Sequence, residues 1–174
     1  MDQAAEQLSK EQIQLVVFRL AGETYGVDIH RVREIIRVQQ ITRVPKTPDF
    51  VEGIINLRGG VIPVIDLRKR LNLHTEETTE DARIVVIEQQ EQTIGMIVDQ
   101  VSQVLRIDSA TVEPPSPFIV TVDTRYLAGI AKLTDQLIVL LDLDHVLTEN
   151  ERDHLSRIAL EVDPDALEGN VPHE

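Results

Sequence analysis

Short runs of aliphatic residues alternate with polar and turn-forming residues along most of the chain. Segment 15–26, LVVFRLAGETYG, is typical, with an aliphatic block, a glycine-containing turn and a second short apolar block. Val, Ile and Leu dominate these runs, and β-branched residues favour extended strands. Because the runs are short and most are followed by turn residues, the pattern predicts a mainly all-β fold built from hairpins.

The same pattern occurs twice. Segment 84–95, IVVIEQQEQTIG, repeats 15–26, and segment 129–143, GIAKLTDQLIVLLDL, repeats 53–67, GIINLRGGVIPVIDL. The two alignments have different offsets, and the extra length of the second copy falls within 106–125. The repeat predicts two tandem five-stranded β-barrels, at approximately 15–75 and 82–147, and it allows an exchange of end strands between them.

Turn residues suggest where the hairpins reverse. The first hairpin of each copy is predicted to turn at Gly22-Glu23 and at Glu91-Gln92. The second hairpin of the first copy is predicted to turn at Gly59-Gly60, a type of residue pair that favours positive φ. Pro63 has no backbone N–H to donate, so its strand is expected at a sheet edge or at a bulge.

A helix is predicted near the C-terminus. Thr148 and Glu151 have the capping-box spacing. Apolar residues then follow at helical spacing, at Leu155, Ile158, Ala159 and Val162. Pro164 is expected to end the helix. Segment 28–36 could form a shorter helix, but packing of its apolar residues in a core is the preferred interpretation.

The remaining polar segments are expected to connect or flank these elements. Residues 72–82 are predicted to be a linker between the copies, and 1–11 and 163–174 to be flexible tails.

The charge of the chain argues against nucleic acid and membrane partners. Lys and Arg total 17, Asp and Glu total 30, and the net charge is −13. Such a surface repels phosphate backbones and anionic lipids. No apolar run approaches the length of a membrane span, and the N-terminus lacks the pattern of a signal peptide. We therefore expect a cytoplasmic protein without direct membrane insertion.

The sequence carries no recognisable catalytic or cofactor motif. Cysteine is absent, and the five histidines are scattered without metal-ligand spacing, so no metal, cofactor or catalytic residue is predicted. Asp66 and Asp142 repeat at equivalent positions. They could form a paired-carboxylate site, but capping of the turn after each strand is the preferred interpretation. Arg58 either binds a partner or forms an ion pair with Glu34 or Asp66.

Four segments together resemble one known family. They read YGVDIHRVREII (25–36), ITRVPKTPDFVEGIINLRGGVIPVIDLRKRL (41–71), IGMIVDQVSQVL (94–105) and YLAGIAKLTDQLIVLLDLDHVL (126–147). The sequence resembles the CheW family from about residue 12 to residue 160, and the hairpin with its NLRG core is the most specific part. The resemblance implies two SH3-like barrels with short helices and a C-terminal helix.

The resemblance also implies a function. CheW proteins are non-enzymatic adaptors that couple the cytoplasmic tips of chemoreceptors, the methyl-accepting chemotaxis proteins, to the regulatory domain of a CheA-type histidine kinase. The expected location is the cytoplasm, with recruitment to receptor arrays at the membrane. An adaptor of a related system, such as type IV pilus twitching motility, is the alternative.

Site residues carry over by position in the family. The receptor-binding set, expected in a groove between the barrels, is Val32, Glu34, Asn56, Arg58, Val98 and Val101. The kinase-binding set is Ile41, Val44 and Ile62 on the first barrel and Glu113 and Phe118 at the opposite contact. The family often has a basic residue where Glu113 stands, so the charge pairing of that contact is expected to differ here.

Overall fold

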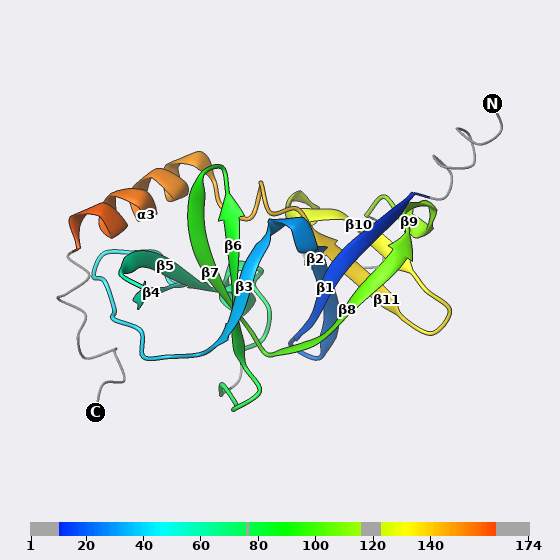
Figure 1. The fold of residues 1–174 in the computed structure, drawn as a ribbon, viewed down its shortest axis with the longest axis horizontal. Coiled ribbons are helices and arrows are strands. Elements are labelled where there is room, and N and C mark those ends of the chain that lie inside the picture. The colour runs from blue at the N-terminus through cyan, green and yellow to red at the C-terminus, as the bar shows by residue number, and fades with distance from the viewer. Residues whose placement is uncertain (1–10, 76, 116–122, 163–174) are drawn as a thin grey trace.

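The computed structural model describes residues 11–75, 77–115 and 123–162 of the chain. It contains two β-sheets that lie side by side along the long axis of the molecule, with helix α3 (Glu149–Glu161) at one end (Figure 1). Sheet A has the strand order β8 (Gln100–Asp108), β1 (Gln12–Leu20), β2 (Glu23–Asp28), β11 (Leu137–Leu141), β10 (Leu127–Lys132) and β9 (Val112–Glu113). Sheet B has the order β3 (Val32–Arg37), β6 (Arg83–Gln89), β7 (Gln92–Val98), β5 (Gly60–Asp66) and β4 (Val51–Leu57). The predicted mainly-β class is confirmed.

Each sheet curls back on itself as a small barrel. In sheet B, an antiparallel bridge between Thr42 and Ile54 connects the segment after β3 to β4. In sheet A, β8 leads through the short 3-10 turn η2 (Ser109–Thr111) into β9, which pairs with β10. The last strand of each sheet is thereby joined to the chain that continues from its first strand, which protects the sheet edges. The result is two SH3-like β domains.

The two barrels do not coincide with the two sequence copies. The opening hairpin of the first copy, β1–β2, lies in sheet A, where β2 pairs in parallel with β11. The opening hairpin of the second copy, β6–β7, lies in sheet B, where β7 pairs in parallel with β5. Sheet B is therefore continuous along the chain, and sheet A takes strands from both ends of the fold. The ranges 15–75 and 82–147 differ from the observed barrels for this reason.

Successive side chains along the exchanged hairpins alternate between two cores. One set packs inside the barrel that contains the hairpin, and the other set packs against the second barrel. In β1, Leu15 and Val17 belong to the interior of sheet A, whereas Val16 and Phe18 belong to a larger core between the sheets. In β6 the corresponding residues follow the same alternation. We call this larger core, shared by both sheets, the seam. Each fully buried aliphatic side chain contributes about 1.5–3 kcal/mol relative to exposure.

The hairpin turns lie one residue earlier than the sequence suggested. Leu20 pairs with Glu23, Gln89 with Gln92, and Leu57 with Gly60. The residues between them have positive φ in all three hairpins, at Ala21, Gly22, Arg58, Gly59, Gln90 and Glu91. These are two-residue turns of the type I′ class, whose twist matches that of the strands. The predicted positions were wrong because turn composition does not reveal which residues pair across the hairpin.

One other local prediction was wrong, at Pro63, and the choice between a helix and core packing over 28–36 is decided in favour of core packing. Pro63 lies in β5, an interior strand between β4 and β7. Proline is tolerated there because pairing with β7 begins only at Val64. The alternative helix over 28–36 does not form: η1 (Ile29–Arg31) is a single 3-10 turn, followed directly by β3. Its apolar residues pack against the cores instead, as the second interpretation expected.

The predicted caps are confirmed. The Thr148 hydroxyl accepts from the Glu151 backbone N–H at 3.1 Å, and the Glu151 carboxylate accepts from the Thr148 N–H at 2.8 Å. Asp66 caps α2 (Leu67–Arg70) by accepting from the Arg68 N–H at 3.0 Å. Asp142 accepts from the Asp144 N–H at the same distance. Residues 1–10 and 163–174 of the predicted tails lie outside the described residues.

Candidate protein-interaction site

The β4–β5 hairpin presents Arg58 on a rigid turn. Arg58 has φ of +52° and Gly59 has φ of +87°, as a type I′ turn requires. The Asn56 side-chain oxygen accepts a hydrogen bond from the Gly59 N–H at 2.9 Å and so braces the turn from within. Arginine is an unusual residue for a left-handed backbone, which costs about 1 kcal/mol or more. Non-glycine residues also have positive φ in the other two hairpin turns, so this conformation belongs to the turn type, and the case for Arg58 rests on its side chain.

Arg58 forms an ion pair with Glu34 on β3. Its guanidinium nitrogen Nη1 lies 2.9 Å from Glu34 Oε2, and Nη2 contacts Oε1. The Arg58 side chain is 67% exposed and the Glu34 side chain 29%. Asp66, the other predicted ion-pair partner, contacts Arg68 instead. Because the pair is solvated on the Arg58 side, it contributes only about 0–1 kcal/mol to stability and leaves donors free for a partner.

The ion pair borders a depression of about 370 Å³. Its wall combines charged, aliphatic and hydroxyl groups, from Arg33, Glu34, Leu57, Arg58, Gly60, Ile62, Val86 and Thr93. Ile62, predicted in the kinase-binding set, therefore lies beside Glu34 and Arg58 of the receptor-binding set. Arg33, Leu57 and Thr93 were not predicted. Arg33 donates to the Thr93 hydroxyl at 3.2 Å and pairs with Glu88, so its position is set by β6 and β7.

The three valines of the receptor-binding set gather at the seam. Val98 is fully buried in the seam core, and Val32 and Val101 are partly buried against it. Val98 can therefore support the surface residues but cannot contact a partner itself, which corrects its assignment as a contact residue. Val32 and Glu34 are both on β3, but a register shift lies between them. Val32 pairs with Ile87 of the seam core and Glu34 pairs with Val86 of the interior of sheet B, so the apolar and the charged parts of the predicted receptor site project from opposite faces of the strand.

Two exposed aliphatic residues extend this apolar part. Ile35 pairs with Val85 and Val104 pairs with Val16, and both of these partners are buried in the seam core. Residues directly opposite on neighbouring strands project from the same face of a sheet. Ile35 and Val104 therefore stand on the seam side of their sheets, although they are 39% and 52% exposed.

We call Val32, Ile35, Val101 and Val104 the seam strip. Sequence reasoning missed Ile35 and Val104. The alternation of apolar and polar residues identifies the apolar face of a strand, but it does not show which residues of that face are exposed to solvent. The one available signal was the repeat, which aligns Ile35 with Val104.

The predicted kinase-binding residues are dispersed. Ile41 packs partly buried against the interior of sheet B, and Val44 is half-buried in the loop that follows. Glu113 is exposed on β9 and pairs with Lys132 at 3.0 Å. Lys132 thus provides a basic group next to the position where the family often has one. Phe118 lies outside the described residues.

Other polar groups have structural roles. Burial, followed by the nearby charge of Glu23, raises the pKa of the Tyr25 phenol, so Tyr25 stays neutral and donates to Glu23. Hydrogen bonds from Arg125 lower the pKa of Asp123, which caps η3 (Thr124–Tyr126). Across 11–75, 77–115 and 123–162, no cluster of three His, Asp or Glu has the geometry of a metal site. In the same ranges no helix is long and apolar enough to cross a membrane.

The interlocked barrels define a double SH3-like protein whose seam leaves aliphatic side chains exposed. A sequence model of the CheW-like domain matches residues 14–151. The chain therefore belongs to the CheW family.

Individual relatives agree with this assignment. The chain is 34% identical to a chemotaxis protein CheW of Klebsiella aerogenes, over 84% of this chain and 88% of the relative. It is 37% identical to a chemotaxis protein CheW of Bacillus subtilis, over 76% of this chain and 85% of the relative. The crystal structure of the scaffolding protein TtCheW from Thermoanaerobacter tengcongensis superposes with a TM-score of 0.75 at 45% identity, covering 80% of this chain and 90% of that one.

Proposed function

We propose that this chain is a non-enzymatic cytoplasmic adaptor that couples the tips of chemoreceptors to a CheA-type histidine kinase in arrays at the membrane. The observation that carries the proposal is the seam strip, which exposes aliphatic side chains on β3 and β8, while Glu34 of the Glu34–Arg58 pair projects from the other face of β3. The relatives described above are named as chemotaxis proteins, and this supports chemotaxis over the twitching-motility alternative.

The receptor tip is the proposed occupant of the seam strip. An amphipathic helical hairpin carries apolar residues at spacings of three and four, which suit an aliphatic strip on two barrels. Val32 and Ile35 would contribute from β3, and Val101 and Val104 from β8. Arg58, Glu34 and Asn56 would set the register through charge and hydrogen bonding, which gives specificity more than affinity.

The kinase is the proposed partner of two other regions. Ile41 and Val44 lie in the chain that closes sheet B, and Glu113 lies on β9, which closes sheet A. Closing segments of the two barrels would thus each meet one kinase domain, so that adaptor and kinase alternate. Ile62 would act from the Arg58 depression, and Phe118 belongs to the second region by its place in the chain.

Co-sedimentation with receptor signalling domains on vesicles tests the receptor surface. We expect Val104→Glu to weaken binding by about tenfold or more, because a charge in an apolar contact must be desolvated. Leu160→Glu is the matched control: Leu160 is 82% exposed on α3, away from the seam strip. Equal binding by the Val104→Glu, Leu160→Glu and unmodified proteins would contradict the proposed surface.

Arg58→Ala tests the charged part of the same surface. We expect a change in thermal stability no larger than that of a typical surface ion pair, about 0–1 kcal/mol, together with reduced kinase activation in reconstituted receptor membranes. Arg157→Ala removes another exposed arginine and should leave activation unchanged. If Arg58→Ala unfolds the protein and has no separate binding defect, Arg58 is structural.

A further inference from the structure

The chain consists of two interlocked halves that are joined by the segment 72–82. The first half contains β1 to β5 and α2, and the second half contains β6 to β11 and α3. Strand pairings cross between the halves at β1 with β8, β2 with β11, β3 with β6 and β5 with β7. Each barrel is therefore built from strands of both halves.

Each hydrophobic core of the described residues also belongs to both halves. Inside sheet A, Leu15 and Val17 of the first half share a core with Ile138 of the second half. Inside sheet B, Val64 of the first half shares a core with Ile84 of the second half. The seam core likewise contains buried side chains from both. Because burial of apolar surface is the dominant favourable contribution to folding, each half needs the other as its binding partner.

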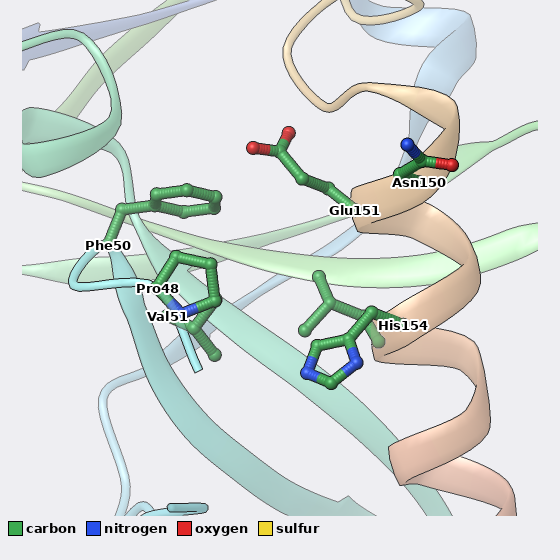
Figure 2. A pocket seen from close by; sticks show the side chains of 7 residues that line it. Pro48, Phe50, Val51, Asn150, Glu151 and His154 are labelled. Atoms are coloured by element: carbon green, nitrogen blue, oxygen red, sulfur yellow. The ribbon is translucent and has the colours of Figure 1, made fainter. Parts of the chain in front are cut away.

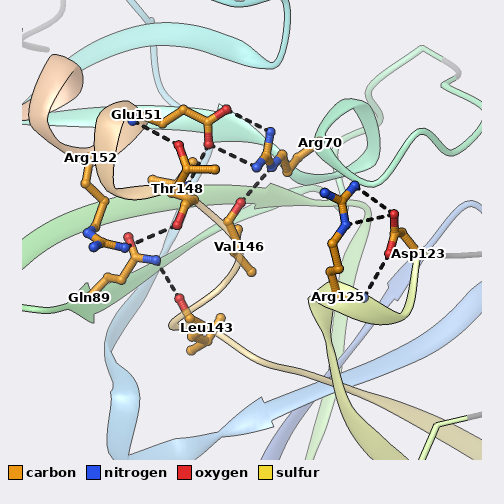
Figure 3. Close-up of polar contacts among 10 residues, drawn as sticks. Arg70, Gln89, Asp123, Arg125, Leu143, Val146, Thr148, Glu151 and Arg152 are labelled. Carbon is orange, nitrogen blue, oxygen red and sulfur yellow. Dashed lines mark hydrogen bonds and ion pairs between the residues drawn. The ribbon is translucent and has the colours of Figure 1, made fainter.

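Helix α3 adds polar and apolar contacts between the halves. His154 of the second half and Phe50 of the first half line opposite walls of a cavity of about 200 Å³ (Figure 2). Next to it, the two terminal nitrogens of Arg70 donate to the Glu151 carboxylate at 2.9 and 3.1 Å, and its Nε donates to the Val146 carbonyl at 2.6 Å (Figure 3). The first half thus recognises α3 by specific contacts that do not depend on the covalent connection.

The covalent connection lies on the surface. The described residues from 74 to 81 are exposed. The Thr78 hydroxyl accepts a long hydrogen bond from Arg68 at 3.5 Å, and the Asp81 N–H donates within the segment to the Thr79 hydroxyl at 3.2 Å. An exposed polar segment of this kind changes its conformation at little cost in free energy. It can therefore act as a hinge between the halves.

We infer that the chain exchanges halves with a second copy of itself, by opening of the hinge at 74–81, and so forms a domain-swapped dimer. In this dimer the first half of each chain completes both barrels with the second half of the other chain, through the same strand pairings. The seam strip is then shared between chains: Val32 and Ile35 come from one copy, and Val101 and Val104 come from the other.

The balance between monomer and dimer depends on the protein concentration. Both forms contain the same barrel contacts, but the dimer pays the entropy loss of association. A short flexible connection holds the two halves of one chain at an effective concentration in the millimolar range. Chains that refold together near this concentration therefore exchange halves. Folded chains do not exchange them, because every core is shared and both barrels must open first.

Thiol cross-linking of the full chain tests the exchange, because the sequence contains no cysteine. Arg37 on β3 pairs with Arg83 on β6, and neither residue is buried. The Cβ atoms of such directly opposite residues lie about 4.5–5.5 Å apart. The Arg37→Cys and Arg83→Cys proteins are mixed, unfolded in urea, refolded together at about 1 mM and treated with a short thiol-to-thiol cross-linker. We expect a covalent dimer on a denaturing gel, with a dimer-to-monomer ratio that falls about tenfold when the refolding concentration is lowered tenfold.

Two further pairs of variants control this experiment. Gln14→Cys with Arg106→Cys tests the pairing of β1 with β8 in the other barrel, and it decides the question if a variant of the first pair fails to fold. Arg19→Cys with Thr24→Cys is the matched control, because these residues pair across the β1–β2 hairpin within the first half. Exchange of halves leaves them in different units of the dimer, so no covalent dimer is expected.

Several results would overturn the inference. One is the absence of a covalent dimer from both crossing pairs, and another is an equal yield from the control pair. An equal yield after mixing without urea would show contact between the surfaces of intact molecules instead. A dimer from one crossing pair alone, with all four crossing variants folded, would contradict the exchange of whole halves at this hinge.

Discussion

The two copies of the repeat occupy equivalent places in the fold, yet they meet the seam with different chemistry. The last residue of β1 is Leu20, fully buried among apolar neighbours, whereas the equivalent last residue of β6 is Gln89. Gln89 is also buried, and its Nε2 donates to the Leu143 carbonyl at 2.6 Å (Figure 3). Among the described residues its Oε1 has no partner. The two copies therefore share a buried position at the end of this strand, but the residue at that position is apolar in one copy and polar in the other.

The ion pairs that link the exchanged hairpins also differ, and their polarity is reversed. On one side Arg68, after β5, lies 3.2 Å from Asp99, after β7. On the other side Asp144, at the position corresponding to Arg68, lies 2.9 Å from Arg31, after β2. Arg68 is only 6% exposed, whereas Arg31 is 31% exposed. The comparison shows that both copies have the same strand geometry, whereas the ion pairs that join them differ in polarity and in burial.

The largest expected effect concerns the repeated glycines Gly53 and Gly129. A Cβ added at Gly53 would lie 2.1 Å from the Thr42 carbonyl oxygen, and φ there is +146°. At Gly129 the nearest atoms, on Val112 and Glu113, are at 2.8 and 2.9 Å. We expect Gly53→Ala to lower the free energy of unfolding by about 4 kcal/mol and Gly129→Ala by about 2 kcal/mol. Urea denaturation measures both, and equal losses would contradict the asymmetry.

The stability of the protein should respond unequally to the exchange of residue type at Leu20 and at Gln89. Leu20→Gln buries an amide among apolar groups and should cost about 3 kcal/mol. Gln89→Leu removes an unpaired oxygen but also the hydrogen bond to Leu143, so its stability should stay within about 1 kcal/mol of the unmodified protein. Thermal and urea unfolding of the two variants decide this, and a large loss in Gln89→Leu would show that the amide is essential to the seam.

The reversed ion pairs predict a smaller contrast. Asp99→Ala leaves the buried Arg68 with less compensation and removes the carboxylate that accepts from the Ala21 N–H at 2.8 Å. We expect a loss of about 2 kcal/mol. Asp144→Ala breaks the more exposed pair and should cost less than about 1 kcal/mol. High salt should reduce only the second effect, because buried pairs are little screened; similar losses in both variants would contradict the prediction.

The smallest effect on stability is expected at the β4–β5 turn. Arg58→Gly relieves the left-handed strain of Arg58 and loses a solvated ion pair, so the two changes should cancel to within about 0.5 kcal/mol. Receptor co-sedimentation should nevertheless fall. Thr134→Gly changes the corresponding position of the second copy and is the matched control. A stability loss above 1 kcal/mol in Arg58→Gly would show that the Glu34 pair supports the fold.

Part of the candidate site could be predicted from the sequence. The repeat placed Val32 and Val101 at equivalent positions, and the NLRG hairpin singled out Arg58 before its partner was known. The exposure of Ile35 and Val104 could not be predicted, because it depends on where each strand leaves the seam. The cavity between the start of β4 and helix α3 was equally hidden, because Phe50 and His154, which line it, are about one hundred residues apart in the sequence.

The sequence by itself determined the duplication, the hairpins, the capped C-terminal helix and the family. These features depend on side-chain periodicity and on local hydrogen bonds, which are written in neighbouring residues. Only the tertiary structure decided that each copy lends its opening hairpin to the other barrel, and which residues the seam leaves exposed. Backbone groups on every strand edge are alike, so the choice of neighbouring strand depends on how the whole set of apolar faces is buried.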